Sequence, residues 1–596
     1  MSEAAIEHLD NGWLRECIGI TKLDVPNWLI GGYVRLWVQA NDGHPKGAAF
    51  SEEETVSTAA SAGQRRKFWS WGYEGQDIPE SDVKSMHERV AKRLNMTDFS
   101  ILKDPTLDEI EIRAPRIKPP ASLSAFCTTE KWDRVAHTYG KSFRDLAMIY
   151  KRKYPNPPDI VAYPRNEQEI SAVLDWCGTN GYAAVPFGGG SSVTGGINPP
   201  TDDHYKGVVT IDLEHLNKVL EVDPVSRAAR IQAGTFGPSL ENQLKPHGFT
   251  LRHIPQSWEF STLGGWIATR SSGHYATHLT HIDDMVESLR VVTPTGTIEN
   301  RRLPGSGAGP NPDRGFIGSE GTLGIITEAW MRLQGRVKFR ANAAVSFKSF
   351  YEGARAVRQI TQAGLYPANC RYLDEKDAFF YGAGDGSESM LLIGYESADH
   401  PVDAWLERSL EICRDFNGTV KQQAGNGDAA LETSRSGQQG SWRNQFRYLP
   451  YLMHVRAAMG IVSFTFETAY TWDKFEALDT EVMRRVAEAE KRICGGGIVC
   501  RRFSFLYPDG PAPYYSIMAP SNHEKNIEHY QALSNVASDA LLELGATITH
   551  HHAVGRSFRP WYDKEADPGF IRMMKAAKRE LDPNWVLNPG ILFDRT

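Results

Sequence analysis

The chain has 596 residues, too many for a single hydrophobic core, so two or three domains are expected. Its hydrophobic fraction of 41% and charged fraction of 23% are ordinary for a globular protein. The formal net charge of -7 at pH 7 argues against nucleic acid as a partner, because binding its backbone needs clustered Lys and Arg.

Membrane, targeting and metal-site signals are also missing. No apolar run reaches the ~18–20 residues that span a bilayer, and the first residues lack the pattern of a secretory signal. The final residues, FDRT, do not resemble an SKL-type peroxisomal signal. The 7 cysteines form no CxxC pair, so no structural metal site is expected. We expect a soluble intracellular protein and leave its compartment open: cytoplasmic, on a membrane surface, or, in a eukaryote only, peroxisomal.

Residues 1–120 are predicted to form an N-terminal extension that is irregular or helical. Ser51–Gly63 has the composition of a linker. The segment Trp28–Trp37 is apolar and aromatic, which favours core or interface packing, with a membrane contact as the alternative. Arg65–Tyr73 (RRKFWSWGY) stands out as an aromatic island.

Residues 121–335 alternate short apolar runs with helical patterns, which predicts one α+β or α/β domain. A helix is expected at 166–181, where apolar residues recur at helical spacing. Strands are predicted at 159–164, 182–185, 207–213, 229–233 and 286–293.

Residues 336–550 are predicted to form a second domain, a mixed sheet with helices on one face. Its helices are expected at 351–363, 402–416 and 472–493, and its strands at 390–395, 497–506 and 514–518. In residues 551–596 a helix at 567–582 ends before Pro583, and the last residues are expected to pack back on the first domain. The predicted fold class is therefore α+β.

The glycine-rich loop Pro186–Gly196 (PFGGGSSVTGG) directly follows a predicted strand. Glycines permit positive φ and close backbone approach, so successive N–H groups can form an anion nest. The alternative is a flexible hinge. The spacing differs from the GxGxxG fingerprint, and no GK[ST] follows as in a P-loop.

Two more glycine-bearing stretches follow in order, at 256–273 (with QSWEFSTLGGW and TRSSG) and 318–327 (GSEGTLGIIT). With the first loop they resemble the vanillyl-alcohol-oxidase flavoprotein family, whose two-lobed PCMH-type domain binds FAD. The resemblance implies that the first loop binds the pyrophosphate, and the absence of His at 189–192 implies non-covalent FAD. The implied FAD-binding residues are Pro186, Phe187, Gly188, Gly189, Gly190, Ser191, Ser192, Thr194, Gly195, Gln256, Ser257, Ser261, Thr262, Gly264, Gly265, Thr269, Arg270, Ser271, Ser272, Gly273, Glu320, Gly321, Thr322, Gly324, Ile325 and Ile326.

Three consecutive histidines, His550, His551 and His552, offer anion contacts, proton transfer or metal ligation. Adjacent residues rarely supply three ligands to one metal, so no metal is predicted, and an accidental surface run is the alternative. The stretch 507–515 (YPDGPAPYY) contains no His. Flavin-linked 2-hydroxy-acid dehydrogenases of this fold carry a His-rich HxGDGNxH pattern there, so its absence counts against that activity.

Several segments together resemble the alkyldihydroxyacetonephosphate synthase family, flavoenzymes of ether-lipid synthesis. They are the aromatic island, Glu259–Trp266, Phe466–Ala469 and the His cluster. The resemblance implies that a long-chain alcohol replaces the acyl group of acyl-dihydroxyacetone phosphate with no net redox change, while oxidised FAD holds the substrate carbon. The implied partners are a lipid-like phosphate substrate and a fatty alcohol. Peripheral membrane contact and a homodimer are left open.

The resemblance also implies residue roles. Tyr514 matches the family's acid/base tyrosine, with Tyr515 as the alternative if the match slips by one; either could instead be a core aromatic. The histidines would bind phosphate or relay protons. A phenol pKa of about 10 would have to be lowered by neighbouring cations.

One position departs from the family. Where the family carries a substrate-binding Arg, this chain has Met453, and Arg456 shares its face if the stretch is helical. Arg371, in an Arg-x-x-Asp segment that does match, is either structural or substrate-binding. The departure keeps open an FAD-linked oxidase or dehydrogenase of an alcohol or hydroxy acid. A non-catalytic flavin-binding or lipid-carrier protein is the third hypothesis.

Overall fold

The structure, a computed structural model, describes residues 65–595 except 98, 202–203 and 425–437. The predicted linker Ser51–Gly63 and the segment Trp28–Trp37 lie outside these residues. Among the described residues, no helix is both long and apolar enough to cross a membrane. Helices and strands share the fold, and the α+β class is confirmed.

The aromatic island and one helix make up the described part of the extension. Arg66 pairs with Tyr73 in an isolated bridge. The helix α2, Glu80–Arg93, has acidic residues in its first turn and basic residues in its last, as the helix dipole favours. Its buried Met86 and Val90 pack against Leu452 and Val455. The extension thus has a definite helix, docked on the second domain.

The FAD-binding region consists of two sheets. The first has the order β1-β2-β4-β3, and β2, β4 and β3 run parallel. The second has the order β5-β6-β10-β8-β9 and is antiparallel. The strands are β1 Cys127–Thr128, β2 Ile160–Ala162, β3 Tyr182–Phe187, β4 Gly207–Asp212, β5 Val219–Asp223, β6 Ala228–Gln232, β8 Val286–Thr293, β9 Gly296–Glu299 and β10 Ile325–Arg332.

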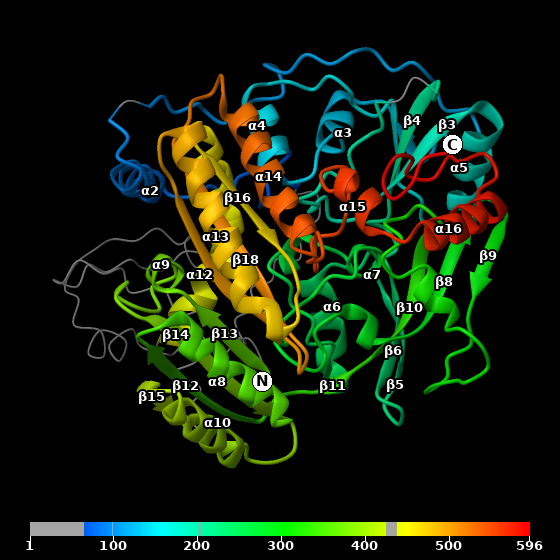
Figure 1. Ribbon diagram of the computed structural model, residues 1–596. Helices are drawn as coiled ribbons and strands as arrows, with labels where there is room; N and C mark the ends of the chain where they lie inside the picture. The colour runs from blue at the N-terminus through cyan, green and yellow to red at the C-terminus, as the bar shows by residue number, and fades with distance from the viewer. Residues whose placement is uncertain (1–64, 98, 202–203, 425–437, 596) are drawn as a thin grey trace, which may run out of the picture.

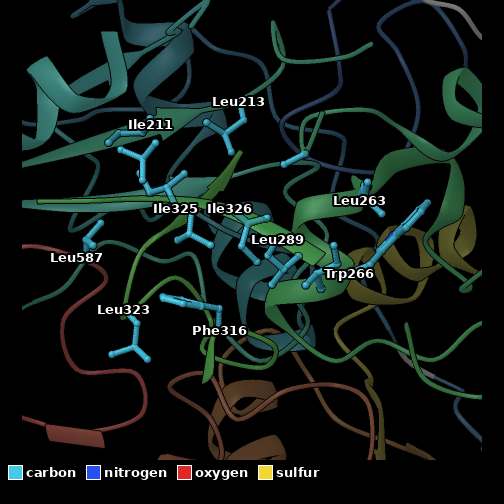
Figure 2. Packing of buried hydrophobic residues seen from close by; sticks show 14 of the residues in the cluster. Ile211, Leu213, Leu263, Trp266, Leu289, Phe316, Leu323, Ile325, Ile326 and Leu587 are labelled. Atoms are coloured by element: carbon cyan, nitrogen blue, oxygen red, sulfur yellow. The ribbon is translucent and has the colours of Figure 1, made fainter. Parts of the chain in front are cut away.

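One hydrophobic cluster joins both sheets. Ile211 of β4, Leu289 of β8 and Ile325 of β10 belong to it and are almost fully buried. Figure 2 shows them in the same cluster as Trp266. The helices of this region are α3 Lys131–Ala136, α4 Phe143–Tyr150, α5 Glu167–Asn180, α6 Gly237–Leu244 and α7 Leu263–Ala268. The short strands β7 Phe249–Thr250 and β11 Gln334–Gly335 pair with each other.

The predicted helix at 166–181 is α5, and its ends follow from its sequence. Asn166 caps its N-terminus by accepting the N–H of Glu169, and Gly181 ends it in the left-handed region at φ 73°. Each of the five predicted strands is present within a few residues. The sequence analysis missed β10, which begins inside the glycine-rich stretch 318–327.

The second domain is built on a seven-stranded sheet of order β15-β12-β14-β13-β17-β18-β16. Every pairing in it is antiparallel, so the expected mixed sheet is corrected on this point. The strands are β12 Phe339–Phe347, β13 Asn369–Leu373, β14 Ser389–Ser397, β15 Thr419–Ala424, β16 Val462–Glu467, β17 Ile498–Leu506 and β18 Pro511–Ala519.

Helices cover both faces of this sheet rather than one. On one face lie α8 Phe350–Gln362, α10 Asp403–Asp415, α13 Trp472–Cys494 and α14 Asn526–Glu543 (Figure 1). On the other lie α9 Glu375–Phe380 and α12 Gln438–Ala458. The rest of this second face meets the FAD-binding region, where Leu506 N–H donates to the Ala276 carbonyl (2.8 Å).

The last residues pack against β3. The last two helices are α15 Arg559–Glu565 and α16 Pro568–Leu581. After them the chain pairs with Ala184 of β3: the Ala184 N–H donates to the Val586 carbonyl (2.7 Å), and the Ala184 carbonyl accepts the Asn588 N–H (2.9 Å). The Asn588 amide also donates to the carbonyls of Gly196 and Glu320. The C-terminal segment therefore holds two of the predicted FAD-binding stretches together.

Candidate active site

The glycine-rich loop begins where β3 ends at Phe187. Gly190 and Gly195 have φ values of 71° and 73°, a conformation that favours glycine. Within the described chain, the backbone N–H groups of residues 189–193 form no hydrogen bond. Five consecutive free N–H groups at the end of a strand can bind an anion. This observation supports a pyrophosphate site at the loop.

Close packing explains why this loop is built from glycine. A Cβ on Gly188 would lie 2.3 Å from Thr262 Oγ1, and one on Gly189 would lie 1.9 Å from the Phe260 carbonyl oxygen. The first and second predicted FAD-binding stretches are thus in contact. Phe187 lies beneath Gly190, whose added Cβ would come within 2.8 Å of the ring.

The aromatic island supports this loop from outside. Arg66 donates to the Gly188 carbonyl (3.1 Å) and forms an ion pair with the buried Asp212 (3.0 Å). Trp71 and Tyr73 pack their rings against Phe260. The island has a structural role at the cofactor loop that the sequence analysis did not assign.

The other end of the loop lies beside the His cluster. Thr194 Oγ1 donates to the His552 carbonyl (3.4 Å), and the Thr194 carbonyl accepts the N–H of Arg556 (3.0 Å). Ser192 Oγ accepts the Gly196 N–H (3.0 Å), while Ser191 is half-buried. The predicted cofactor loop and the predicted catalytic residues are therefore adjacent.

The second stretch is held mainly by its own hydrogen bonds. Ser257 Oγ donates to Ser261 Oγ (3.1 Å), which accepts the Trp266 indole N–H (2.7 Å). Thr269 donates to the Gly265 carbonyl (2.8 Å). Gly264 packs on Ala233, and Gln256 is half-buried.

Residues 270–273 run toward the second domain. Arg270 has φ 52°, and its half-exposed side chain forms an ion pair with Asp283. Ser271 and Ser272 contact His253 (2.9 Å) and His281 (3.3 Å) respectively. The Gly273 carbonyl accepts from Arg371 (3.3 Å).

The third stretch fixes the chain after the His cluster. The buried Glu320 carboxylate accepts the N–H groups of Val554 and Gly555. Burial raises its pKa to about 7, although these two N–H groups oppose the change. Gly321, at φ 74°, packs against Pro186.

The remaining members of this stretch have side chains away from the loop. Thr322 Oγ1 donates to the Ser319 carbonyl, and the Thr322 carbonyl accepts from Lys578. Gly324 packs against Val291, while Ile325 and Ile326 lie in the core (Figure 2). At Thr322, Gly324, Ile325 and Ile326, only main-chain atoms are therefore available to contact a cofactor.

The buried carboxylate of Glu467 organises the His cluster. One oxygen accepts from Thr549 Oγ1 (2.6 Å) and from the N–H groups of His551 (3.0 Å) and His552 (2.9 Å). The other accepts the His550 N–H (2.7 Å) and lies 3.2 Å from Nδ1 of His551. Burial opposes its ionisation, but the histidines hold its pKa well below the usual range.

Glu467, His550 and His551 also bring potential ligand atoms within 4.8 Å of one another. Both Glu467 oxygens, however, already accept hydrogen bonds from backbone or hydroxyl donors. A metal would have to displace these bonds, so the arrangement is that of a hydrogen-bonded carboxylate rather than a ligand set.

Tyr514 lies against the same histidines. Its hydroxyl donates to Thr465 Oγ1 (2.9 Å), and its ring centroid is 6.0 Å from that of His551 and 5.4 Å from that of His552. The guanidinium of Arg502 sits 4.3 Å from its ring centroid. Sheet register explains this grouping, because Tyr514 of β18 is opposite both Glu467 and Arg502, and opposed residues share a face.

The pKa of Tyr514 is not lowered as expected. Burial raises it above the usual value, and the charge of Arg502 and the hydrogen bond with Thr465 only oppose that rise. At neutral pH Tyr514 therefore carries its proton.

Tyr515 faces the other side of the sheet. It stacks on Phe466 (4.8 Å) and donates to Asp479 of α13 (3.0 Å). Successive strand residues point to opposite faces, so Tyr515 cannot reach the histidines while Tyr514 does.

Arginines line the sheet face beyond Tyr514. Arg371 donates to the Gly273 and His274 carbonyls (3.3 and 3.4 Å), and burial lowers its pKa to about 9. Arg502 donates to the Tyr381 hydroxyl (3.0 Å) and pairs with Asp377 (3.3 Å). The sequence analysis missed Arg502, since nothing in its local pattern separates it from Arg501.

Arg456 and Met453 lie one helical turn apart on α12, as the sequence analysis assumed. Arg456 donates to Ser463 Oγ (3.3 Å), two positions before Thr465 on the same face of β16. Among the described residues it has no carboxylate partner, and its Nε makes no hydrogen bond. Met453 packs with the apolar cluster of the extension instead.

Comparisons with known proteins agree with this geometry. Residues 158–301 match the model of an FAD binding domain, and residues 336–592 match the C-terminal domain of FAD linked oxidases. The alkyldihydroxyacetonephosphate synthase of Dictyostelium discoideum is 30% identical over 490 residues, which are 78% of this chain and 78% of that protein. The chain belongs to the alkyldihydroxyacetonephosphate synthase family.

Two further relatives agree with that assignment. The synthase of Caenorhabditis elegans is 30% identical over 494 residues, 77% of this chain and 80% of that protein. A solved structure of an alkyldihydroxyacetonephosphate synthase superposes with a TM-score of 0.72 at 25% identity, covering 88% of this chain and 99% of that one. The predicted cofactor, FAD, is confirmed by these matches and by the free N–H groups of the loop.

Proposed function

We propose that this protein is an FAD-dependent alkyldihydroxyacetonephosphate synthase that exchanges the acyl chain of acyl-dihydroxyacetone phosphate for a long-chain alcohol. The observation that carries the proposal is the placement of Tyr514 against His551 and His552, 5.4–6.0 Å between ring centroids, beside the cofactor loop. Family membership supports the same reaction.

The cofactor is held without a covalent bond by the loop N–H groups and by the stretches packed on it. When bound, oxidised FAD supplies an electrophile for the substrate carbon without net electron transfer. The chain supplies the proton chemistry. Tyr514 holds a proton at its hydroxyl, and the neighbouring histidines provide nitrogens that can accept one.

Glu467 keeps the acceptor in place. It binds the backbone N–H of all three histidines, so their rings stay next to Tyr514. Its negative charge also stabilises a protonated imidazole at the site during turnover.

The phosphate of the substrate is bound by arginine. Arg456 is half-buried and lacks a carboxylate partner among the described residues, so its charge is available to an anion. Arg371 is the second candidate, on the same sheet as Tyr514. Arg456 would then replace the arginine that the family carries at the position of Met453.

A labelled-alcohol assay tests this function. The flavin-loaded protein is incubated anaerobically with hexadecanoyl-dihydroxyacetone phosphate and radiolabelled hexadecanol. We expect an alkali-stable ether product, release of one hexadecanoate per ether, and an oxidised flavin spectrum at the end. Labelled hexadecanoate should also exchange into the acyl substrate.

The competing hypothesis, an FAD-linked oxidase or dehydrogenase, predicts a reduced flavin in the same assay. An FAD-linked oxidase or dehydrogenase would bleach the flavin with an alcohol or hydroxy acid and recover it with oxygen or an acceptor. Bleaching without ether formation would refute the synthase assignment. The oxidase or dehydrogenase hypothesis is kept because Met453 stands where the family carries a substrate-binding arginine.

A further inference from the structure

A fourth imidazole belongs to the His cluster. His281 lies just before β8, and its Nε2 is 3.1 Å from Nε2 of His550, with ring centroids 4.5 Å apart. The hydroxyl of Tyr507 is 2.7 Å from the same nitrogen of His550. Neither residue was among those that the sequence predicted.

The proton of His281 can be assigned from its neighbours. Its Nδ1 is 3.0 Å from the Arg270 carbonyl, which can only accept, so Nδ1 carries the hydrogen. A neutral imidazole has one N–H, so Nε2 is bare. Burial lowers the pKa of His281, and the charges of Arg270 and His551 add to the effect. The hydrogen bond with the Arg270 carbonyl and the charge of Asp283 oppose it, but the pKa stays below its usual value, so the ring is neutral at pH 7.

The other end of the cluster is fixed by Glu467. Because this carboxylate is ionised and 3.2 Å from Nδ1 of His551, that nitrogen carries a hydrogen. The same Nδ1 is 3.1 Å from Nδ1 of His550, which must therefore be bare. The remaining proton of His550 is on Nε2.

Both ends give the same assignment for His550. Its Nε2–H donates to the bare Nε2 of His281 and is shared with the Tyr507 oxygen, whose own hydrogen goes to Thr280 Oγ1 (3.0 Å). The other tautomer of His550 would point its Nδ1–H at the Nδ1–H of His551 and leave the lone pair of its Nε2 facing the lone pair of His281 Nε2. Burial also lowers the pKa of His550, with His281 and His551 adding to the effect.

We propose that His281 is a positioning residue of the active site: by accepting the Nε2–H of His550, it fixes the tautomers of His550 and His551. A neutral His551 then carries no hydrogen on Nε2, and its ring stacks against Tyr514. The tautomers follow from the contact geometry together with a neutral His281 and an ionised Glu467. The use of that nitrogen as the proton acceptor rests on the proposed function.

Two substitutions distinguish the contact of His281 with His550 from its contact with the Arg270 carbonyl. In His281→Gln, the longer side chain places an amide oxygen near the position of Nε2 and keeps an acceptor for His550. In His281→Asn, the shorter amide keeps a donor for the Arg270 carbonyl but cannot reach His550. His278→Asn is the matched control, because His278 is exposed on the same loop.

The two variants should differ in kcat. Loss of a tautomer-setting partner costs up to about 10⁴-fold in other enzymes, and Tyr507 still holds His550 here, so we expect about a 10- to 100-fold fall for His281→Asn. KM and flavin content should be unchanged. His281→Gln and His278→Asn should stay within about threefold of the parent. Equal loss in the Gln and Asn variants, or a loss confined to KM or flavin content, would overturn the proposal.

A second measurement does not depend on activity. In flavin-loaded protein with ¹⁵N-labelled histidine rings, His550, assigned with a His550→Gln variant, should be the Nε2–H tautomer, and His281→Asn should change its ring shifts. An Nδ1–H tautomer of His550 would overturn the proposal. If the tautomers are as expected but no ether forms, only the proposed function is wrong.

Discussion

Removing one hydroxyl from each of two adjacent tyrosines should separate catalysis from stability. Tyr514→Phe deletes the hydroxyl that donates to Thr465 beside His551 and His552, and Tyr515→Phe deletes one that donates to Asp479 on the opposite face. Backbone, strand and ring burial are shared by the two variants. Each is therefore the matched control of the other.

The size of each effect follows from its contacts. A positioned acid or base contributes about 10²–10⁴-fold to rate, so Tyr514→Phe should lower kcat by that factor, or ~3–5 kcal/mol of transition-state stabilisation. Its cost in stability is about 1 kcal/mol for one neutral hydrogen bond. Tyr515→Phe removes a bond to a carboxylate and should cost about 1.5–3 kcal/mol in stability with kcat nearly unchanged.

The assay combines the rate of ether formation at saturating substrates with thermal unfolding of the same flavin-loaded samples. Tyr514→Phe should be the slower enzyme and Tyr515→Phe the less stable protein. The reasoning fails if Tyr515→Phe loses as much activity as Tyr514→Phe, or if Tyr514→Phe keeps more than about a third of the parent's kcat.

Three further changes have defined outcomes. Gly189→Ala should release most of the FAD, seen as lost flavin absorbance after gel filtration, because its Cβ would lie 1.9 Å from the Phe260 carbonyl oxygen; full retention would contradict the packing. Arg456→Gln should raise KM for the phosphate substrate by about 10- to 100-fold with the KM for hexadecanol unchanged; a change in kcat alone would argue against phosphate binding. Burial raises the pKa of Glu490 from about 4.5 to about 8, so this carboxyl favours folding below pH 4.5 and loses that contribution as pH rises to 8. Glu490→Gln should therefore be more stable than the parent above pH 8, by up to about 4 kcal/mol in chemical unfolding, and similar near pH 4.5; an equal difference at both pH values would contradict this.

Local patterns located much of the fold. The predicted helix and strands of the FAD-binding region are present, because apolar spacing and end signals such as Asn166 and Gly181 act over a few residues. The missed strand β10 begins in a glycine-rich stretch, which reads locally as a loop. The sequence could not show that helices cover both faces of the second sheet, because the face that a helix covers is set by tertiary packing and not by the local pattern.

The sequence by itself determined the cofactor through the glycine-rich loop. It also offered the three histidines and, through the family resemblance, Tyr514 as predicted reacting groups. Tertiary structure alone decided how they work together. Glu467 reaches His550 across 83 positions, and Arg502 lies over Tyr514 through the register of β17 and β18. His281 joins from a third segment of the chain. Register and docking depend on the packing of many distant residues at once, so no local pattern specifies them.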